Sequence, residues 1–405
     1  MSNGTQGRVH PCGIQTAWTE SMNVSEAVAA VAHGFALKPI GFILVFFSPA
    51  YDAVDLSNSL AVAFPGVAVA GCSTSGGISP AGAIDRGLVV IAFPQKGFRI
   101  FSEVITLIDR IDMDDVAASV RSLCNCLDQH QTKAESCQRF ALSLIDAFAN
   151  AEEKVVSAVA WALNGIPLVG GSAGDDLTFR GTVMLHGDQI HTNAAVLVLV
   201  ETDFPVRIFK TDNFEPMTRR FVVTAANEDE RRVYELNAEP AAVEYATAVG
   251  LDPVHLTPMS FAAYPLAVKI GGEFHCRSIS RLDEDGSLVF FCAISEGAVL
   301  ALTKPRDIVE AMQAELSRLN ETLGGLDLVI GFNCVLRRLD AESRQVQPSI
   351  VNLYRKFNVV GFETYGEQYL SMHLNQTFTG IAIGRGKKLD LVRASDELDS
   401  SAERT

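Results

Sequence analysis

The chain has 405 residues, of which 48% are hydrophobic and 20% are charged, with a net charge of −15 and a mean hydropathy of +0.19. This composition supplies apolar side chains for two or three domain cores and excludes a largely disordered chain. The acidic charge is spread along the sequence, which excludes the clustered Lys and Arg that neutralise nucleic-acid phosphates. No apolar run approaches the roughly 18 residues that a membrane-spanning helix needs.

The amino-terminal segment MSNGTQGRVHPCGIQTAWTE has no apolar stretch of the kind found in secretion signals. We therefore expect a cytoplasmic protein whose eight cysteines are reduced thiols. Several of them, such as Cys292 in LVFFCAIS and Cys334 in LVIGFNC, lie in strand-like apolar runs. Cysteine in such a run packs as a small hydrophobic residue.

The first strongly patterned segment is a buried-strand run at 41–48, followed by a helical segment at 54–64 and a second strand at 67–71 that ends in a glycine loop. A closing strand at 87–93 completes this unit. Two similar units follow. Their first strands begin at 140 and 326, their helical segments lie at 152–163 and 350–357, their strand-to-loop segments at 166–176 and 359–368, and their closing strands at 194–200 and 377–384.

The glycine loops of the three units align as GCSTSGG from Gly71, GGSAGDD from Gly170 and GFETYGE from Gly361. Each glycine follows the start of the first strand of its unit, at 41, 140 or 326, by 30, 30 or 35 residues. The strands are apolar on both faces, which indicates sheets covered by helices. We predict an α/β fold with mixed sheets built from three related strand–helix–strand–loop–strand units.

A different pattern separates the second unit from the third. It predicts a helix that begins near Pro240, a hairpin around the turn from Asp283 to Gly286, and an amphipathic helix over 303–320 with Pro305 near its start. We place a domain boundary near residue 235, giving domains at 1–235 and 236–388. The acidic segment 389–405 is predicted to be a disordered tail.

The glycine loops do not carry a familiar catalytic or phosphate-binding motif. They lack the Lys of a phosphate loop, the G-x-G-x-x-G of a dinucleotide site and the G-x-S-x-G of a nucleophile elbow. Loops at the ends of sheet strands are nevertheless where α/β proteins bind ligands, and Asp175, Asp176, Glu363 and Glu367 add polar groups there. A small-molecule pocket is the favoured hypothesis, and an enzyme using Cys72 or the Asp175–Asp176 pair is the alternative.

The histidines and cysteines show no metal-site spacing. His186 and His191 flank a predicted hairpin, and the group Cys124, Cys126 and Cys137 lacks a second pair of ligands. His275 and His373 each lie in an apolar segment. Such a residue is either a hydrogen-bonded core histidine or the single imidazole ligand of a five-coordinate haem.

Several motifs together resemble a known family. GCSTSGGIS at 71–79, PLVGGSAGDDLTF at 167–179 and VYELNAEPAAVEY at the predicted boundary look like the FIST N-terminal and C-terminal domains, over about residues 20 to 385. FIST domains are implied to be intracellular sensory modules that bind small ligands. The segment YGEQYLSMHLNQTF further resembles the NosP branch. That likeness implies a non-enzymatic protein that binds haem b, senses nitric oxide and regulates a histidine kinase or a cyclic-di-GMP enzyme.

On this resemblance, His373 is the first choice for the haem iron ligand and His275 the second. The alternative is a haem-free FIST sensor of a small metabolite such as an amino acid. Neither nucleic acid nor a membrane is an expected partner, and a homodimer is a further expectation. The residues expected to form the loops of a ligand pocket are Gly71, Cys72, Ser73, Gly171, Ser172, Asp175, Glu363, Tyr365 and Glu367.

Overall fold

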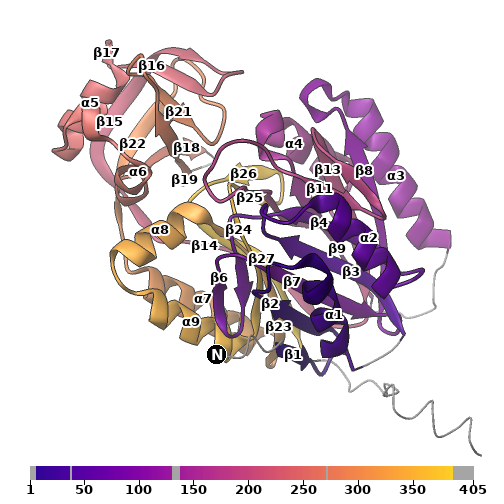
Figure 1. The fold of residues 1–405 in the computed structure, drawn as a ribbon. Helices are drawn as coiled ribbons and strands as arrows, with labels where there is room; N and C mark the ends of the chain where they lie inside the picture. The colour runs from indigo at the N-terminus through magenta and orange to yellow at the C-terminus, as the bar shows by residue number, and fades with distance from the viewer. Residues whose placement is uncertain (1–5, 37–38, 130–136, 271, 386–405) are drawn as a thin grey trace, which may run out of the picture.

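The structure is a computed structural model, which describes residues 6–36, 39–129, 137–270 and 272–385. The predicted acidic tail lies outside these residues. The described residues are 30% helix and 41% strand in several mixed sheets, which confirms the predicted α/β class. Figure 1 shows a body that contains three of the sheets and a smaller lobe, at the upper left, that runs from β15 to β22.

The body contains the three units expected from the sequence, each with two parallel strands, a helix between them and an antiparallel closing strand. They are β3 (Ile40–Phe47), α2 (Ala53–Ala63), β4 (Ala68–Ser73) and β7 (Leu88–Pro94); β9 (Gln138–Ile145), α4 (Glu152–Ala162), β10 (Leu168–Ser172) and β13 (Ala194–Thr202); and β23 (Leu326–Cys334), α9 (Gln347–Phe357), β24 (Val359–Thr364) and β27 (Thr377–Gly384).

A short hairpin between the second and closing strands of each unit pairs with the sheet of another unit. These hairpins are β5 (Gly77–Ser79) with β6 (Gly82–Ile84), β11 (Met184–His186) with β12 (Gln189–His191), and β25 (Glu367–Tyr369) with β26 (Met372–Leu374). The first adds to β24, the second to β4 and the third to β10. This exchange is cyclic, so each unit completes the sheet of another and the three form one body.

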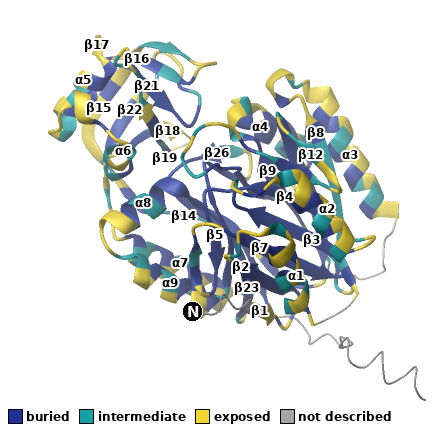
Figure 2. Cartoon of the chain, in the orientation of Figure 1, coloured by how far each residue is buried: buried dark blue, intermediate teal, exposed yellow. Residues whose placement is uncertain are grey.

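The remaining strands of the body extend the three sheets. They are β1 (Gln6–Val9) and β2 (Gln15–Thr19) beside β7, β8 (Phe98–Thr106) beside β13, and β14 (Val206–Asp212) beside β27. Helices pack on the outer faces, where Figure 2 shows exposed residues facing solvent. These further helices are α1 (Val24–Gly34), α3 (Met113–Gln129), α7 (Ile308–Thr322) and α8 (Val335–Ser343), with the 3-10 turns η1 (Ile108–Arg110) and η2 (Ala147–Ala149).

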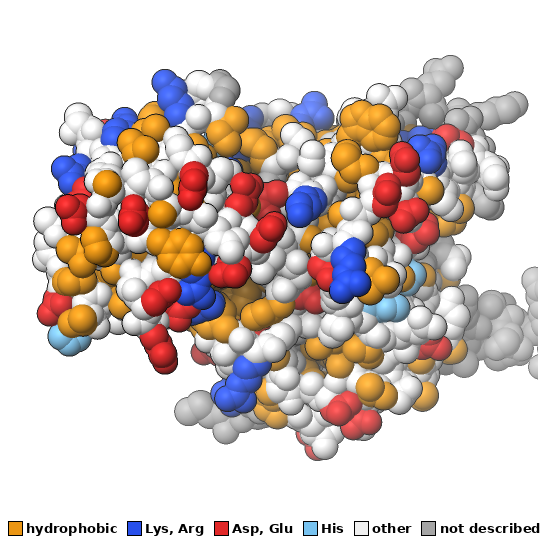
Figure 3. Space-filling view, turned by 90° about the horizontal axis from the view of Figure 1, so that it is seen from above, with side chains coloured by type: hydrophobic (Ala, Val, Ile, Leu, Met, Phe, Trp, Pro, Cys, Tyr) orange, Lys and Arg blue, Asp and Glu red, His pale blue; other side chains and the backbone are white. Residues whose placement is uncertain are grey.

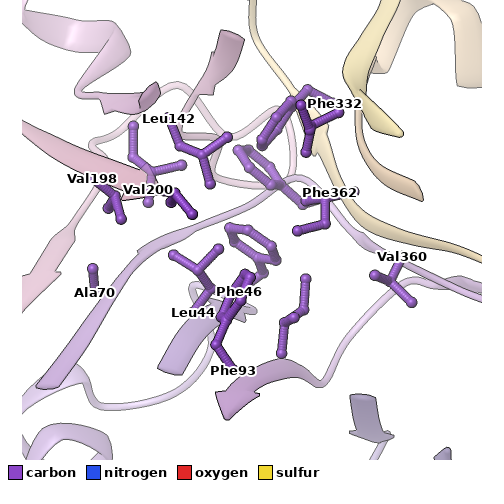
Figure 4. Close-up of a cluster of buried hydrophobic side chains, with 14 of the residues drawn as sticks. Leu44, Phe46, Ala70, Phe93, Leu142, Val198, Val200, Phe332, Val360 and Phe362 are labelled. Atoms are coloured by element: carbon purple, nitrogen blue, oxygen red, sulfur yellow. The ribbon is translucent and has the colours of Figure 1, made fainter. Parts of the chain in front are cut away.

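One hydrophobic core lies between the inner faces of the three sheets. Figure 4 shows it as a cluster in which Phe362 of β24 lies between Phe46 of β3 and Phe332 of β23. The ring centroids of Phe46 and Phe362 are 4.6 Å apart, and those of Phe332 and Phe362 are 5.5 Å apart. Because strands from all three units supply this core, it fixes the relative positions of their loops.

The smaller lobe is an eight-stranded antiparallel sheet with its own core. Its strands are β15 (Phe214–Asn227), β16 (Arg232–Leu236), β17 (Glu239–Pro240), β18 (Leu266–Ile270), β19 (Glu273–Arg277), β20 (Ile279–Leu282), β21 (Leu288–Phe290) and β22 (Val299–Pro305), and its helical elements are α5 (Ala241–Val249), η3 (Pro253–His255) and α6 (Pro258–Ala263). The chain enters the lobe at Asn213 and leaves it at Arg306, and the Arg306 N–H donates to the Asn213 carbonyl at 2.6 Å.

The helix near Pro240 and the hairpins at 186–191 and 283–286 are confirmed by α5, by β11 with β12, and by β20 with β21. The predicted start of the helix over 303–320 is wrong. Residues up to Pro305 belong to β22, and the helix begins at Ile308 because the Asp307 carboxylate caps the Val309 and Glu310 N–H groups.

The division of the sequence at residue 235 stays a prediction about sequence segments. In space, residues on both sides of 235 contribute strands to the eight-stranded sheet of the lobe. None of the helices within the described residues has the length and apolar character needed to cross a bilayer.

Candidate functional site

The three aligned glycines lie at equivalent places where the second strand of each unit approaches the first. Gly71 is opposite Val45, Gly170 is opposite Ser143, and Gly361 is opposite Gly331. A Cβ at any of the three would lie less than 3.0 Å from the carbonyl oxygen of that opposite residue. The aligned glycines are therefore explained by close packing of the second strand on the first in each unit.

The residues that follow the first two glycines join the units to one another. Cys72 is fully buried in the central core, and burial raises the pKa of its thiol well above the usual range. Ser73 accepts the Val183 N–H at 3.0 Å. A Cβ on Gly171 would overlap the Thr364 side chain, which places this glycine against the third unit. Ser172 accepts from the Gln368 side chain at 3.0 Å, and its N–H donates to the Gly366 carbonyl at 2.7 Å.

Asp175 organises the loop that follows β10. Its carboxylate accepts the Thr178 hydroxyl at 2.8 Å and the hydroxyl of Tyr365. It also accepts three backbone N–H groups, those of residues 179, 180 and 181, at 3.1, 2.6 and 3.1 Å. The same Tyr365 oxygen accepts the Leu177 N–H at 2.7 Å. With these partners, Asp175 stabilises the loop and has little capacity left for a ligand. Asp176 follows it with a positive φ of 57°.

Glu363 and Glu367 lie inside the body. Burial raises the pKa of Glu363 to about 7 and that of Glu367 to about 8. Glu363 accepts the Asn333 amide at 2.7 Å, and Glu367 accepts from the hydroxyls of Thr364 and Thr377. Both carboxyls therefore connect strands of the third unit.

His373 lies on β26 behind the contact between the body and the lobe. It is 3% exposed. Its Nε2 lies 3.4 Å from the Phe291 carbonyl oxygen and its Nδ1 lies 3.5 Å from the Gln368 amide nitrogen. Gly366 packs on its ring, since a Cβ there would overlap Cε1. An iron atom at either nitrogen would have to displace a protein group.

His275 lies on β19 opposite Val268, is 4% exposed and has no hydrogen-bond partner at Nδ1 among the described residues. Burial, helped by Lys210, lowers the pKa of its imidazole. Neither His275 nor His373 lines the pocket described next. His373 therefore does not fit an iron ligand here, because protein groups face both of its ring nitrogens. No cluster of three or more His, Cys, Asp or Glu side chains suited to a metal ion occurs within the described ranges.

A pocket of about 420 Å³ lies where the lobe meets the body, a volume in the range typical of small-molecule sites. We call it the lobe-interface pocket. Its wall comes from η2, the start of α4, the loop after β10, and the lobe around β20 and β21. Its lining residues are Ala147, Phe148, Asn150, Glu152, Phe179, Glu230, Arg231, Ser280, Arg281, Val289, Phe290, Phe291 and Tyr365. Figure 3 shows the face seen from above, where acidic, basic and hydrophobic side chains are interspersed.

Asp146, at the end of β9, holds the η2 side of the pocket. Its buried carboxylate accepts the Phe148 N–H at 2.9 Å, the Asn193 N–H at 2.6 Å and the Thr182 hydroxyl at 2.5 Å. Phe148 is thereby fixed at the wall. Since Thr182 lies near the end of the loop after β10, one carboxylate positions two of the segments that line the pocket.

A buried ion pair fixes the lobe at the opposite wall. Arg231, 4% exposed, donates to both oxygens of Glu152 at 3.3 and 2.5 Å and to Glu153 at 2.9 Å. It also donates to the Phe291 carbonyl at 2.8 Å, and the Ala293 N–H donates to Glu153 at 3.0 Å. These bonds join α4 of the body to the residue before β16 and to the segment after β21 in the lobe.

Of the pocket-loop residues expected from the sequence, only Tyr365 lines this pocket. Asp175 accepts the hydroxyl of Tyr365 from behind the wall. The other seven residues lie where strands pack on one another or where one unit contacts another. Sequence reasoning did not identify the phenylalanines and arginines of the wall. One signal was present in the sequence: Gly170 lies 24 residues before the closing strand of its unit, against 17 for Gly71 and 16 for Gly361. The added residues form the loop that carries Phe179 into the wall.

Two family models match the chain in succession. The FIST N domain model matches residues 41–239 and the FIST C domain model matches residues 241–370. No curated protein matches the chain. The two matches together span most of the sequence, and the lobe-interface pocket draws residues from both. The chain belongs to the FIST family, whose domains are sensors in signal transduction.

Proposed function

We propose that this FIST protein binds a small organic metabolite in the lobe-interface pocket and passes that signal to a partner protein. The observation that carries the proposal is the composition of the wall, in which Phe148 and Phe179 of the first matched segment face Phe291 and Tyr365 of the second. A ligand that touches both the body and the lobe has a different affinity for different lobe positions. Binding then shifts the population of those positions.

The structure of the repeat supports a single site of this kind. The long loop after β10 lies within the second unit, and the lobe is inserted between the second unit and the third. The first and third units pass from their second strands into their hairpins through only a few residues, from Ser73 to Gly77 and from Thr364 to Glu367. The two elements that depart from the repeat thus meet at one place, where they enclose a cavity.

The proposal assigns the protein no catalytic activity and places it in the cytoplasm. The buried, high-pKa thiol of Cys72 and the fully engaged carboxylate of Asp175 support a structural role for the two groups that an enzyme would have used. As partner we propose a signalling enzyme of the classes that the resemblance implies, a histidine kinase or a cyclic-di-GMP enzyme. A homodimer is part of the same proposal and rests on the resemblance alone.

Haem b with nitric oxide as the sensed gas is the other function that the resemblance implies. Its support is the sequence likeness around His373, and the contacts of that residue with Phe291 and Gln368 argue against iron ligation. A visible spectrum after haem addition and gel filtration separates the two proposals. We expect no retained Soret band, whereas a retained band that shifts with nitric oxide would replace the metabolite proposal.

The metabolite proposal is tested by a thermal-shift screen of a metabolite library with the full chain. We expect stabilising compounds whose effect is lost in Ala147→Trp, because an indole at this half-buried position would fill the pocket. The control is Ala61→Trp, at an exposed position on α2 outside the pocket wall. Compounds that stabilise both variants equally would place binding elsewhere and refute the proposal.

A further inference from the structure

We infer that the ligand of the lobe-interface pocket is an organic anion with a flat apolar body, of the class of aromatic carboxylates. This inference rests on the proposed function, since it concerns the same pocket. It follows from three features of the wall, namely a continuous aromatic surface, an arginine without a partner, and carboxylates that are already paired.

The aromatic residues form a continuous surface and not a cage. The ring centroids of Phe179 and Tyr365 are 5.6 Å apart in a stacked arrangement, and Phe291 lies 6.3 Å from Phe179 and 5.7 Å from Tyr365. Phe148 lies 6.4 Å from Tyr365. Rings at these separations contact one another, so they do not enclose a cation on several sides as an aromatic cage does. They offer ring faces and edges against which a flat apolar group can stack.

The accessible positive charge on the wall is Arg281. It lies on β20 opposite Val289 and is exposed, and among the described residues its guanidinium makes no hydrogen bond or ion pair. Arg231 also lines the pocket, with its terminal nitrogens engaged by Glu152, Glu153 and the Phe291 carbonyl. The free guanidinium is therefore that of Arg281, and a planar guanidinium pairs with a carboxylate through two parallel hydrogen bonds.

The carboxylates of the wall leave no good site for a ligand ammonium group. Both oxygens of Glu152 accept from Arg231. Glu230 is more than half exposed and lies 3.4 Å from the Arg232 guanidinium, so solvent weakens what it can contribute. A cation or a zwitterion would bring an ammonium into the pocket without a buried partner, and such a group is costly to desolvate. An anion has no such penalty here because Arg281 faces it.

The test compares four probes that share a ring and differ in charge: benzoate, neutral benzamide, cationic benzylamine and zwitterionic L-phenylalanine. Binding to the full chain is measured by saturation-transfer NMR of the probes, with dissociation constants from titration. Arg281→Gln removes the charge at an exposed position. The control is Arg110→Gln, whose side chain is 86% exposed on η1 outside the pocket wall.

We expect benzoate to bind more tightly than the other three probes, and Arg281→Gln to weaken benzoate by roughly 10-fold with little effect on benzamide. Arg110→Gln should leave all four unchanged. Tighter binding of benzylamine or L-phenylalanine, or equal binding of benzoate to Arg281→Gln, would overturn the anion inference while the binding itself supports the proposed function. Absence of binding by all four probes at millimolar concentration would also overturn it, and the library screen with Ala147→Trp then decides the proposed function separately.

Discussion

Replacing Arg231 by Leu removes the cation that joins the lobe to the body. Arg231 is 4% exposed and Glu152 is 1% exposed, so the substitution leaves the Glu152 carboxylate buried without a counter-ion. It also removes the donor to the Phe291 carbonyl. Breaking one side of a buried ion pair typically costs about 3–5 kcal/mol. That is a large share of the roughly 5–15 kcal/mol by which a folded protein is stable.

The assay is equilibrium urea unfolding, together with hydrogen exchange of the amides of β21, because the lobe can unfold apart from the body. Arg232→Leu is a matched control from the adjacent position. Arg232 pairs with Asp283 at 2.6 Å, but both side chains are more than a fifth exposed, so we expect a loss of about 1 kcal/mol or less.

A second variant separates loss of the pair from loss of packing. Arg231→Leu combined with Glu152→Leu removes both charges, and replacement of a buried pair by apolar groups is often close to neutral. The double variant should therefore recover much of the stability lost in Arg231→Leu. If Arg231→Leu costs no more than Arg232→Leu, or if Glu152→Leu adds its own full loss in the double variant, the buried pair does not hold the lobe.

Three further predictions concern the interior. Tyr365→Phe removes the hydroxyl that donates to Asp175 and accepts the Leu177 N–H, and it should lower the free energy of unfolding in urea by about 1–3 kcal/mol. A decrease well below about 1 kcal/mol would contradict the role assigned to that hydroxyl. Burial raises the pKa of Glu367 from 4.5 to about 8, so as the pH rises the unfolded chain releases this proton at a lower pH than the folded protein does. The stability that the protonated carboxyl contributes is therefore fully present below about pH 4.5 and is lost as the pH rises to about 8. Glu367→Gln should flatten this decline, and an unchanged pH profile of urea unfolding would refute the shift. The Cys72 thiol should resist alkylation in the native protein near neutral pH, as read by mass spectrometry, and rapid labelling would contradict its burial.

The repeat was visible in the sequence because its strands and glycines follow local rules. Apolar runs at 41–48, 140–148 and 326–332 predicted β3, β9 and β23, and the glycine spacing aligned positions that proved equivalent in the fold. These features are local because strand burial and close strand packing each constrain residue types over a short window. The start of α7 was misplaced because Pro305 is compatible with a helix start as well as with the end of a strand.

The sequence by itself determined the α/β class, the three units and the membership of the FIST family. Only the tertiary structure decided how the units exchange their hairpins and where the lobe meets the body. It brought Phe148, Phe179, Arg281 and Tyr365 to one wall, although they are separated by up to about two hundred residues. The physical reason is that a pocket between the body and the lobe depends on contacts between segments that are distant in the sequence. The residue pattern within one segment does not specify those contacts. The polar residues that stand out in the loops instead form the hydrogen bonds that hold those segments together.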